Sequence, residues 1–284
     1  MDRFEIEPLE ATLGAIVTGV DLSSIDALVW RKIEAAFLEF GVLVFPDQNL
    51  SDREQIAFGS RFGSLEELLP GSTLVSLSNR HEDGSLAGDD ENLAQILRGV
   101  EVWHTGSSYM RLASKAAVLS ADVVPPLGGG TEWADMRAAS DALSDGLKDR
   151  IAGLSAYHSY FYSQAQIGHN VEVGAGYGFD DGPSPLRPLV KIHPETGRPS
   201  LFIGRHAHGI PGMEPEESKK LLDDLLSFAC QSPRTYEHRW HPGDLVIWDN
   251  RCVLHRARPY DHHQEVRVMR HTRISGDPAS EMAA

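Results

Sequence analysis

The residues best suited to chemistry are two histidines that stand far apart in the chain. His104 lies in the run Trp103-His104-Thr105-Gly106, and His255 follows Trp248-Asp249-Asn250-Arg251-Cys252-Val253-Leu254. Neutral imidazoles are ligands for Fe(II), and a 2-His-1-carboxylate iron site leaves positions open for O₂ and a co-substrate. In the usual motif, His-x-Asp, both side chains leave one strand on the same side. Here Gly106 stands at the aspartate position, so one protein ligand is missing.

Composition restricts the class of partner. The chain has 284 residues, with 26 Lys+Arg against 41 Asp+Glu and a net charge of −15. Nucleic acids and anionic membranes are bound by basic clusters, so we expect neither as a partner. We expect a homo-oligomer that acts on a small molecule. Cys230 and Cys252 are the only cysteines, which favours a reducing compartment over a disulfide scaffold. With no apolar run near the roughly 18 residues that span a bilayer and no signal-peptide pattern, we expect a cytoplasmic protein.

The pattern of short apolar segments predicts the fold. We expect strands over 12–20, 42–45, 75–77, 116–124, 186–193, 200–204, 235–240, 244–249 and 265–274. We expect helices over 28–40, 52–62, 134–143, 144–153 and 214–230. The pattern Ser51-Asp52-Arg53-Glu54 predicts a capping box at the start of the second of these. Many short strands with helices gathered in blocks indicate a mainly β protein with flanking helices, a double-stranded β-helix or jelly roll. We expect residues 1–284 to form a single domain.

Two stretches lack such a pattern. Residues 79–100 are polar and lead directly into His104, and residues 160–184 are rich in glycine. Long segments without regular structure inside a compact domain are often functional lids. We therefore expect both stretches to be lid-like loops.

Three motifs in one order give the chain a family resemblance. They are Trp103-His104-Thr105-Gly106-Ser107-Ser108-Tyr109, the run from Gly129 to Ala139 (GGTEWADMRAA), and the run from Gly243 to Arg256 (GDLVIWDNRCVLHR). Together they resemble the taurine / 2,4-dichlorophenoxyacetate dioxygenase family of Fe(II)- and 2-oxoglutarate-dependent oxygenases, over about residues 8–275. The stretches 186–191 and 203–208 are similar to those of (S)-phenoxypropionate (aryloxyalkanoate) dioxygenases.

The resemblance implies roles for individual residues. His104 and His255 match the two iron ligands, Thr131 matches a hydroxyl that hydrogen-bonds 2-oxoglutarate, and Arg267 matches the arginine that receives its distal carboxylate. A guanidinium fork holds a carboxylate by two charge-assisted hydrogen bonds, which suits that role. Without the resemblance, Arg267 could equally be a solvated arginine at a strand edge.

The substrate side departs from the family pattern. Many members carry a second arginine four residues after the one that matches Arg267, and this chain has His271 there. Because alternate residues of a strand share a face, Arg273 could replace it, and Arg205 is another candidate. Ser108, beside the first histidine motif, completes the expected substrate-binding set. The resemblance implies a small carboxylate as substrate, possibly an aryloxyalkanoate.

Gly106 leaves several functions open. In related halogenases a glycine or alanine replaces the carboxylate and a halide takes its place, so chloride or bromide could bind beside Gly106 and be transferred to a C–H carbon. Alternatively, the chain is a hydroxylating, ether-cleaving aryloxyalkanoate dioxygenase whose Asp ligand has been replaced, naturally or by design. A non-catalytic jelly-roll binding protein is a third possibility. A zinc hydrolase would need a further carboxylate or base near the histidines. The catalytic set is thus His104, Gly106 and His255, with Fe(II), 2-oxoglutarate and O₂ as cofactor and co-substrates.

Overall fold

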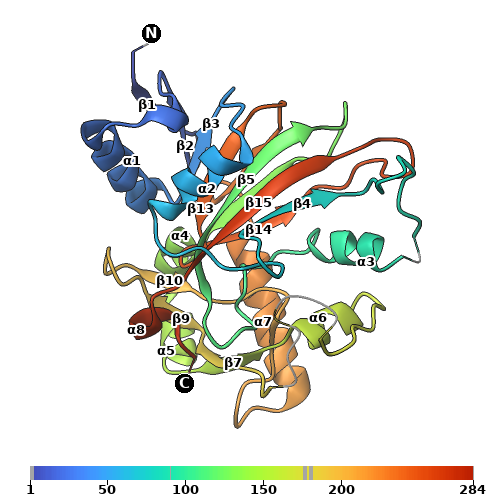
Figure 1. The fold of residues 1–284 in the computed structure, drawn as a ribbon. Coiled ribbons are helices and arrows are strands. Elements are labelled where there is room, and N and C mark those ends of the chain that lie inside the picture. Colours follow the sequence, from blue (N-terminus) through green and yellow to red (C-terminus); the bar gives the residue numbers. More distant parts are fainter. Residues whose placement is uncertain (1–2, 90, 175–177, 179–181, 284) are drawn as a thin grey trace.

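The computed structural model describes residues 3–89, 91–174, 178 and 182–283 (Figure 1). The helices are η1 (Leu22–Ser24), α1 (Ala27–Phe40), α2 (Asp52–Ser60), α3 (Asn92–Gly99), α4 (Met136–Ala142), α5 (Asp145–Ile151), α6 (Tyr160–Ala165), α7 (Pro215–Ala229) and α8 (Pro278–Glu281). The strands are β1 (Glu5–Pro8), β2 (Ala15–Thr18), β3 (Val42–Phe45), β4 (Leu74–Ser78), β5 (Ser114–Val123), β6 (Thr131–Asp135), β7 (Ser155–His158), β8 (Leu186–Pro188), β9 (Val190–Ile192), β10 (Pro199–Leu201), β11 (Ala207–His208), β12 (Thr235–His238), β13 (Leu245–Asp249), β14 (Val253–Ala257) and β15 (Val268–Ser275).

A large sheet and a small sheet form the frame of the molecule. The large sheet has the order β1-β2-β3-β13-β5-β15-β4, and the small sheet has the order β12-β6-β14. A mixed α/β architecture replaces the mainly β class that the sequence indicated. Among the described strands, hydrogen bonding leaves these two sheets separate and does not close them into one barrel.

Apolar side chains hold the layers together. On one face of the large sheet, Phe37 of α1 and Phe58 of α2 pack with Val118 and Ile274 in one buried cluster. Helices α1 and α2 lie over this part of the sheet (Figure 1). A second buried cluster, which contains Trp133 of β6 and Trp248 of β13, fills the space between the two sheets. Burying such side chains contributes about 1.5–3 kcal/mol each, so the sheets form a firm support for the segments between them.

Local signals in the sequence located most elements correctly. Helix α1 ends at Gly41, which has a φ of 72° and a backbone N–H that donates to Phe37 O. Glycine adopts this left-handed conformation without a steric penalty. Helix α2 begins with a capping box between Ser51 and Glu54, as the sequence predicted. Of the described helices, none has the length and the apolar character that a bilayer crossing requires.

Three expectations are wrong. The stretch 79–100 contains helix α3, so it is not a structureless loop. The predicted strand 186–193 is divided at Leu189 into β8 and β9, which pair with different partners. The predicted helix 134–143 begins only at Met136, because the preceding stretch 131–135 forms strand β6. The second lid, 160–184, begins as helix α6, and its positions 175–177 and 179–181 lie outside the described residues.

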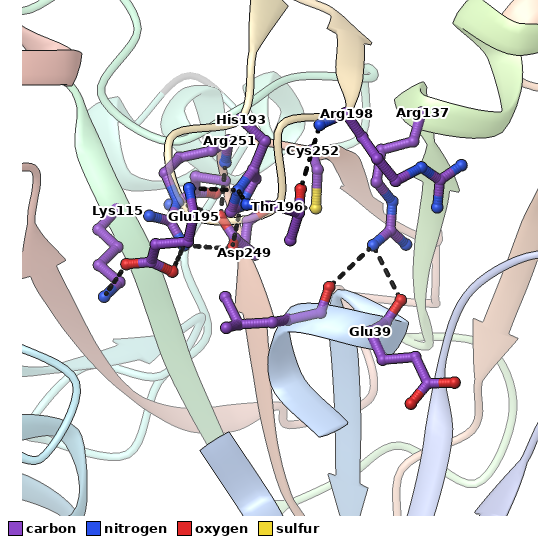
Figure 2. A network of polar contacts seen from close by, with 12 residues as sticks. Glu39, Lys115, Arg137, His193, Glu195, Thr196, Arg198, Asp249, Arg251 and Cys252 are labelled. Atoms are coloured by element: carbon purple, nitrogen blue, oxygen red, sulfur yellow. Dashed lines mark hydrogen bonds and ion pairs between the residues drawn. The ribbon is translucent and has the colours of Figure 1, made fainter. Parts of the chain in front are cut away.

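A buried ionic network fixes the turn that joins β13 to β14 (Figure 2). The Asp249 carboxylate accepts hydrogen bonds from Arg251 Nε at 2.8 Å and Nη2 at 2.6 Å, and it lies 3.0 Å from His193 Nε2. Burial alone would raise the pKa of Asp249, but the Arg251 guanidinium and the His193 ring hold it well below its usual range. The ionised carboxylate therefore keeps the turn, and the strand that follows it, in one position.

We expect Arg251→Met to destabilise the fold strongly. The side chains of Arg251 and Asp249 are only 4% and 1% exposed, and removing one partner of a buried pair costs about 3–5 kcal/mol. The control is Arg198→Met, which removes a pair with Asp141 whose side chains are 44% and 56% exposed. Such surface pairs contribute less than about 1 kcal/mol. Urea unfolding would measure both, and equal losses would contradict the structural role given to Arg251.

Candidate functional site

His104 and His255 meet directly, although they are remote in the sequence. The backbone N–H of His104 donates to His255 O at 3.0 Å, and that of His255 donates to His104 O at 2.8 Å. This antiparallel bridge places the ring centroids 4.2 Å apart. His255 lies on β14, which sequence reasoning missed as a strand, and β14 is held by β6 through pairs such as His255↔Trp133.

Both imidazoles are neutral at physiological pH. Burial lowers the pKa of His104 to about 4 and lowers the pKa of His255 well below its usual value. His104 Nδ1 lies 2.8 Å from Val102 O, and because a carbonyl only accepts, Nδ1 carries the proton and Nε2 keeps its lone pair. The buried Nδ1 of His255 has no hydrogen-bond partner among the described residues. Two adjacent neutral imidazoles form a donor set suited to a divalent metal.

Gly106 lies in a backbone conformation that other residues can adopt. Its φ is outside the left-handed range, so the main chain does not require glycine there. A Cβ at this position would lie 3.0 Å from Asn250 Nδ2 and 3.2 Å from Ser114 Oγ. Both distances are tight, so the Asn250 amide would have to move by a few tenths of an ångström to admit a side chain.

Asn250 connects the two halves of the site. Its backbone O accepts from Thr105 Oγ1 at 2.8 Å, its Oδ1 accepts from Gly106 N at 3.3 Å, and its Nδ2 donates to Ser114 Oγ at 2.9 Å. Trp248 Nε1 also donates to Oδ1, at 2.9 Å. Asn250 therefore joins the His104 segment to the β13–β14 turn. Sequence reasoning gave it no role, although its place between a buried strand and His255 was a usable signal.

Arg267 and Thr131 lie on one side of the site, close to Gly129. Arg267 is 8% exposed, and its Nε donates to Gly129 O at 2.9 Å. Burial lowers the pKa of Arg267 to about 10, and no acidic side chain of the described residues forms an ion pair with it. Thr131 Oγ1 accepts from Trp240 Nε1 at 3.0 Å, so its own hydroxyl proton remains available. A buried guanidinium without a counterion is a strong site for a carboxylate.

Helix α3 covers this side of the site. A cavity of about 40 Å³ is lined by Ala94 and Leu97 of α3, by Asn79 and Tyr260, and by Arg267. Asn79 was not singled out in the sequence, yet its Oδ1 accepts from Arg267 N at 2.9 Å and so fixes the start of the last strand. Helix α3, within the segment 79–100, thus covers the cavity that Arg267 lines.

The last strand presents two of the expected substrate residues to the site. His271 is buried with its ring parallel to that of Trp248, at 6.3 Å and 7°. Arg273 Nη1 donates to Ser107 Oγ at 3.2 Å, and its charge contributes to lowering the pKa of His104 and of His255. Arg270 points to the other face, where it pairs with Asp52 and Asp122.

The other two expected substrate residues are engaged in holding the chain together. The Arg205 guanidinium donates to Gly99 O, to Ser163 O at 2.8 Å and to Gln164 Oε1 at 2.5 Å. Ser108 is buried, and its Oγ lies 3.0 Å from His158 Nδ1. Their direct contact with substrate stays a prediction, whereas the structure assigns each a positioning contact.

A larger pocket lies next to Tyr109 and Tyr160, whose rings pack against that of His206. It has a volume of about 530 Å³ and is lined by aromatic and polar side chains that include Tyr109, His158 and Tyr160. The His206 ring lies between this pocket and the site, with its centroid 4.9 Å from Tyr109 and 6.1 Å from His104.

The match to known proteins agrees with this geometry. Residues 5–273 match the model of the taurine catabolism dioxygenase TauD, TfdA family, and the chain belongs to that family. It is a Fe(II)- and 2-oxoglutarate-dependent dioxygenase, an oxidoreductase. This finding overturns the alternative of a non-catalytic binding protein.

Individual relatives are similar along nearly the whole chain. An (S)-phenoxypropionate/alpha-ketoglutarate-dioxygenase of Sphingobium herbicidovorans is 54% identical, over 99% of this chain and 98% of its own length. A protein of the same description from Delftia acidovorans is 47% identical, over 99% and 98%. The crystal structure of AAD-2 in complex with Mn(II) and N-oxalylglycine superposes with a TM-score of 0.88 at 37% identity, covering 97% of this chain and 98% of that one.

The residues present fit both the metal and the co-substrate. Among the described residues, the buried His255 Nδ1 has no partner, and the contact of His104 Nδ1 with Val102 O leaves the lone pair of Nε2 for a metal. The unpaired Arg267 fits the distal carboxylate of 2-oxoglutarate. Because Gly106 supplies no carboxylate, the protein offers two side-chain ligands where the 2-His-1-carboxylate motif offers three.

We expect Arg267→Met to weaken 2-oxoglutarate binding by at least about tenfold, since a single charge-assisted hydrogen bond contributes about 1.5–3 kcal/mol. Anaerobic calorimetry on the Mn(II)-loaded protein would measure the Kd. Arg270→Met is the matched control, because Arg270 lies three residues further along, on β15, but bonds Asp52 and Asp122. The same Kd in both variants would show that Arg267 does not hold the co-substrate.

Proposed function

We propose that this enzyme oxidises a C–H bond of a small aryloxyalkanoate, of the (S)-phenoxypropionate type, at the expense of 2-oxoglutarate and O₂. The full-length similarity to two (S)-phenoxypropionate/alpha-ketoglutarate-dioxygenases carries this proposal. The pocket of about 530 Å³ beside His206 supports it, because its tyrosines suit an aromatic ring. Oxidation next to the ether oxygen gives an unstable hemiketal-type product, which releases a phenol.

Each part of the site has a task in this proposal. His104 and His255 hold Fe(II), which supplies the coupling of C–H oxidation to the conversion of 2-oxoglutarate and O₂ into succinate and CO₂. Thr131 donates its hydroxyl proton to 2-oxoglutarate, and Arg267 holds the distal carboxylate. The large and small sheets correspond to the two halves of a double-stranded β-helix, which brings these residues together between them.

Positive charge on the substrate side favours an anion. Arg273, with His271 beside it on the same face of β15, is the candidate for the substrate carboxylate. Arg205 and Ser108 support that side by fixing the segments that carry Gln164 and His158. Helix α3 and the described part of 160–184 act as covers that exclude water.

Gly106 determines the choice of product in this proposal. The relatives named above are dioxygenases, which favours oxygenation with water at the position left by the missing carboxylate. Halogenation remains the second candidate, because Gly106 supplies no carboxylate ligand, although Asn250 and Ser114 closely border the space beside its Cα.

We expect turnover of (S)-2-phenoxypropionate to release phenol and succinate in a one-to-one ratio. The assay contains Fe(II), 2-oxoglutarate and O₂, first without halide and then at saturating chloride or bromide, with products identified by mass spectrometry. A halogenated product would establish the second candidate and remove the first. Succinate without phenol, across a panel of aryloxy acids, would contradict the substrate class while retaining the dioxygenase reaction.

We expect Gly106→Asp to increase Fe(II) affinity by at least about tenfold, because it restores a charged ligand. Gly106→Ala is the matched control, since both variants introduce the same Cβ beside Asn250 Nδ2. Anaerobic Fe(II) titration measures the difference. If aspartate and alanine retain iron equally, position 106 does not face the metal.

A further inference from the structure

A second group of metal-binding side chains lies at the rim of α3, away from the catalytic histidines. His262 Nε2 is 3.1 Å from Asp89 Oδ1, and His263 Nε2 is 3.5 Å from the same oxygen. The two histidines are consecutive, yet their ring centroids lie 4.1 Å apart and both rings reach one carboxylate. The loop after β14 therefore directs two imidazole donors at the carboxylate of Asp89, which precedes α3.

The two distances from the histidine nitrogens to Asp89 Oδ1, 3.1 and 3.5 Å, match those between neighbouring ligands of a single ion. Metal–nitrogen and metal–oxygen bonds are about 2.0–2.2 Å, so neighbouring ligand atoms lie about 3.0–3.6 Å apart in octahedral or tetrahedral geometry. The three donors of Asp89, His262 and His263 all lie within 4.8 Å of one another, and their side chains are 48%, 30% and 57% exposed. An ion from solution can reach them without unfolding the chain.

We propose that Asp89, His262 and His263 form a second metal site, which binds a divalent transition-metal ion such as Zn²⁺ or Co²⁺. The inference goes beyond the dioxygenase reaction, because none of these residues belongs to the catalytic set. Two imidazoles and one carboxylate favour this class of ion, whereas Ca²⁺ and Mg²⁺ prefer oxygen ligands throughout.

A neighbouring cation sets the strength of the site. Arg98 Nη2 contacts the same Asp89 oxygen, so it competes with an incoming ion. A second carboxylate is nearby, because Glu101 interacts electrostatically with both Arg98 and His262. Arg98 can therefore pair with Glu101 instead when Asp89 binds the metal.

The ion would connect two segments across the cavity that contains Arg267. Asp89 precedes α3, which contributes Ala94 and Leu97 to the lining, and His262 lines the same cavity from the loop after β14. A metal at this rim consequently fastens α3 over the co-substrate side. Metal binding can therefore be detected from the mobility of α3, without measuring turnover.

The test is Zn²⁺ equilibrium dialysis on the metal-free full-length chain. We expect the variant His262→Gln/His263→Gln to bind one equivalent less than the wild type. The control His241→Gln removes another exposed histidine beside a carboxylate, at 3.6 Å from Asp244, and keeps the wild-type stoichiometry. Arg98→Gln binds Zn²⁺ several-fold more tightly, because the competing charge is gone.

Hydrogen exchange of the peptide over 80–99 provides the second measurement. Zn²⁺ slows exchange there in the wild type and in His241→Gln, and it has no effect in His262→Gln/His263→Gln. Equal stoichiometry in the wild type and the double variant would overturn the proposal, as would unchanged exchange on adding Zn²⁺. Absence of phenol release would contradict the proposed aryloxyalkanoate activity and would not bear on this metal site.

Discussion

The antiparallel bridge between His104 and His255 is the interaction on which the site depends. Two backbone hydrogen bonds, of 3.0 and 2.8 Å, join segments that the chain separates by most of its length. His104 lies outside the named strands, so the contact depends on the support that β14 receives. The bridge persists because β14 is held by β6 on one side and by the turn around Asp249 at its start. The buried ion pair behind the site is thus part of how the imidazoles are positioned.

The surroundings of the bridge are electrostatically positive. Burial holds the imidazoles neutral, and the positive charge of Arg273 contributes to lowering the pKa of both. In a chain with a net charge of −15, this is a local positive region within an acidic molecule. An anionic co-substrate and an anionic substrate both gain from such an arrangement, because the low dielectric of a buried site strengthens the attraction.

The sequence predicted the parts of this site that depend on residue type and local pattern. Alternation along the last strand correctly placed His271 and Arg273 on one face and Arg270 on the other. The Ser51–Glu54 capping box correctly predicted the start of α2. Strand β14 was missed because its short stretch of apolar residues gives way to polar ones, and its pairing with β6 is tertiary. The joining role of Asn250 was equally hidden, since its partners Thr105 and Ser114 are remote in sequence. Helix α3 was missed because the polar residues before it dominate the composition of 79–100.

Arg205 links the positions of helices α3 and α6. One guanidinium holds the carboxyl end of α3 through Gly99 O, and α6 through Ser163 O and Gln164 Oε1. Helix α3 covers the cavity of Arg267, whereas Tyr160 of α6 lines the larger pocket. Displacing either helix must therefore stretch or break bonds to the other. A ligand that displaced one of these helices would in this way strain the contact that holds the other over its own cavity.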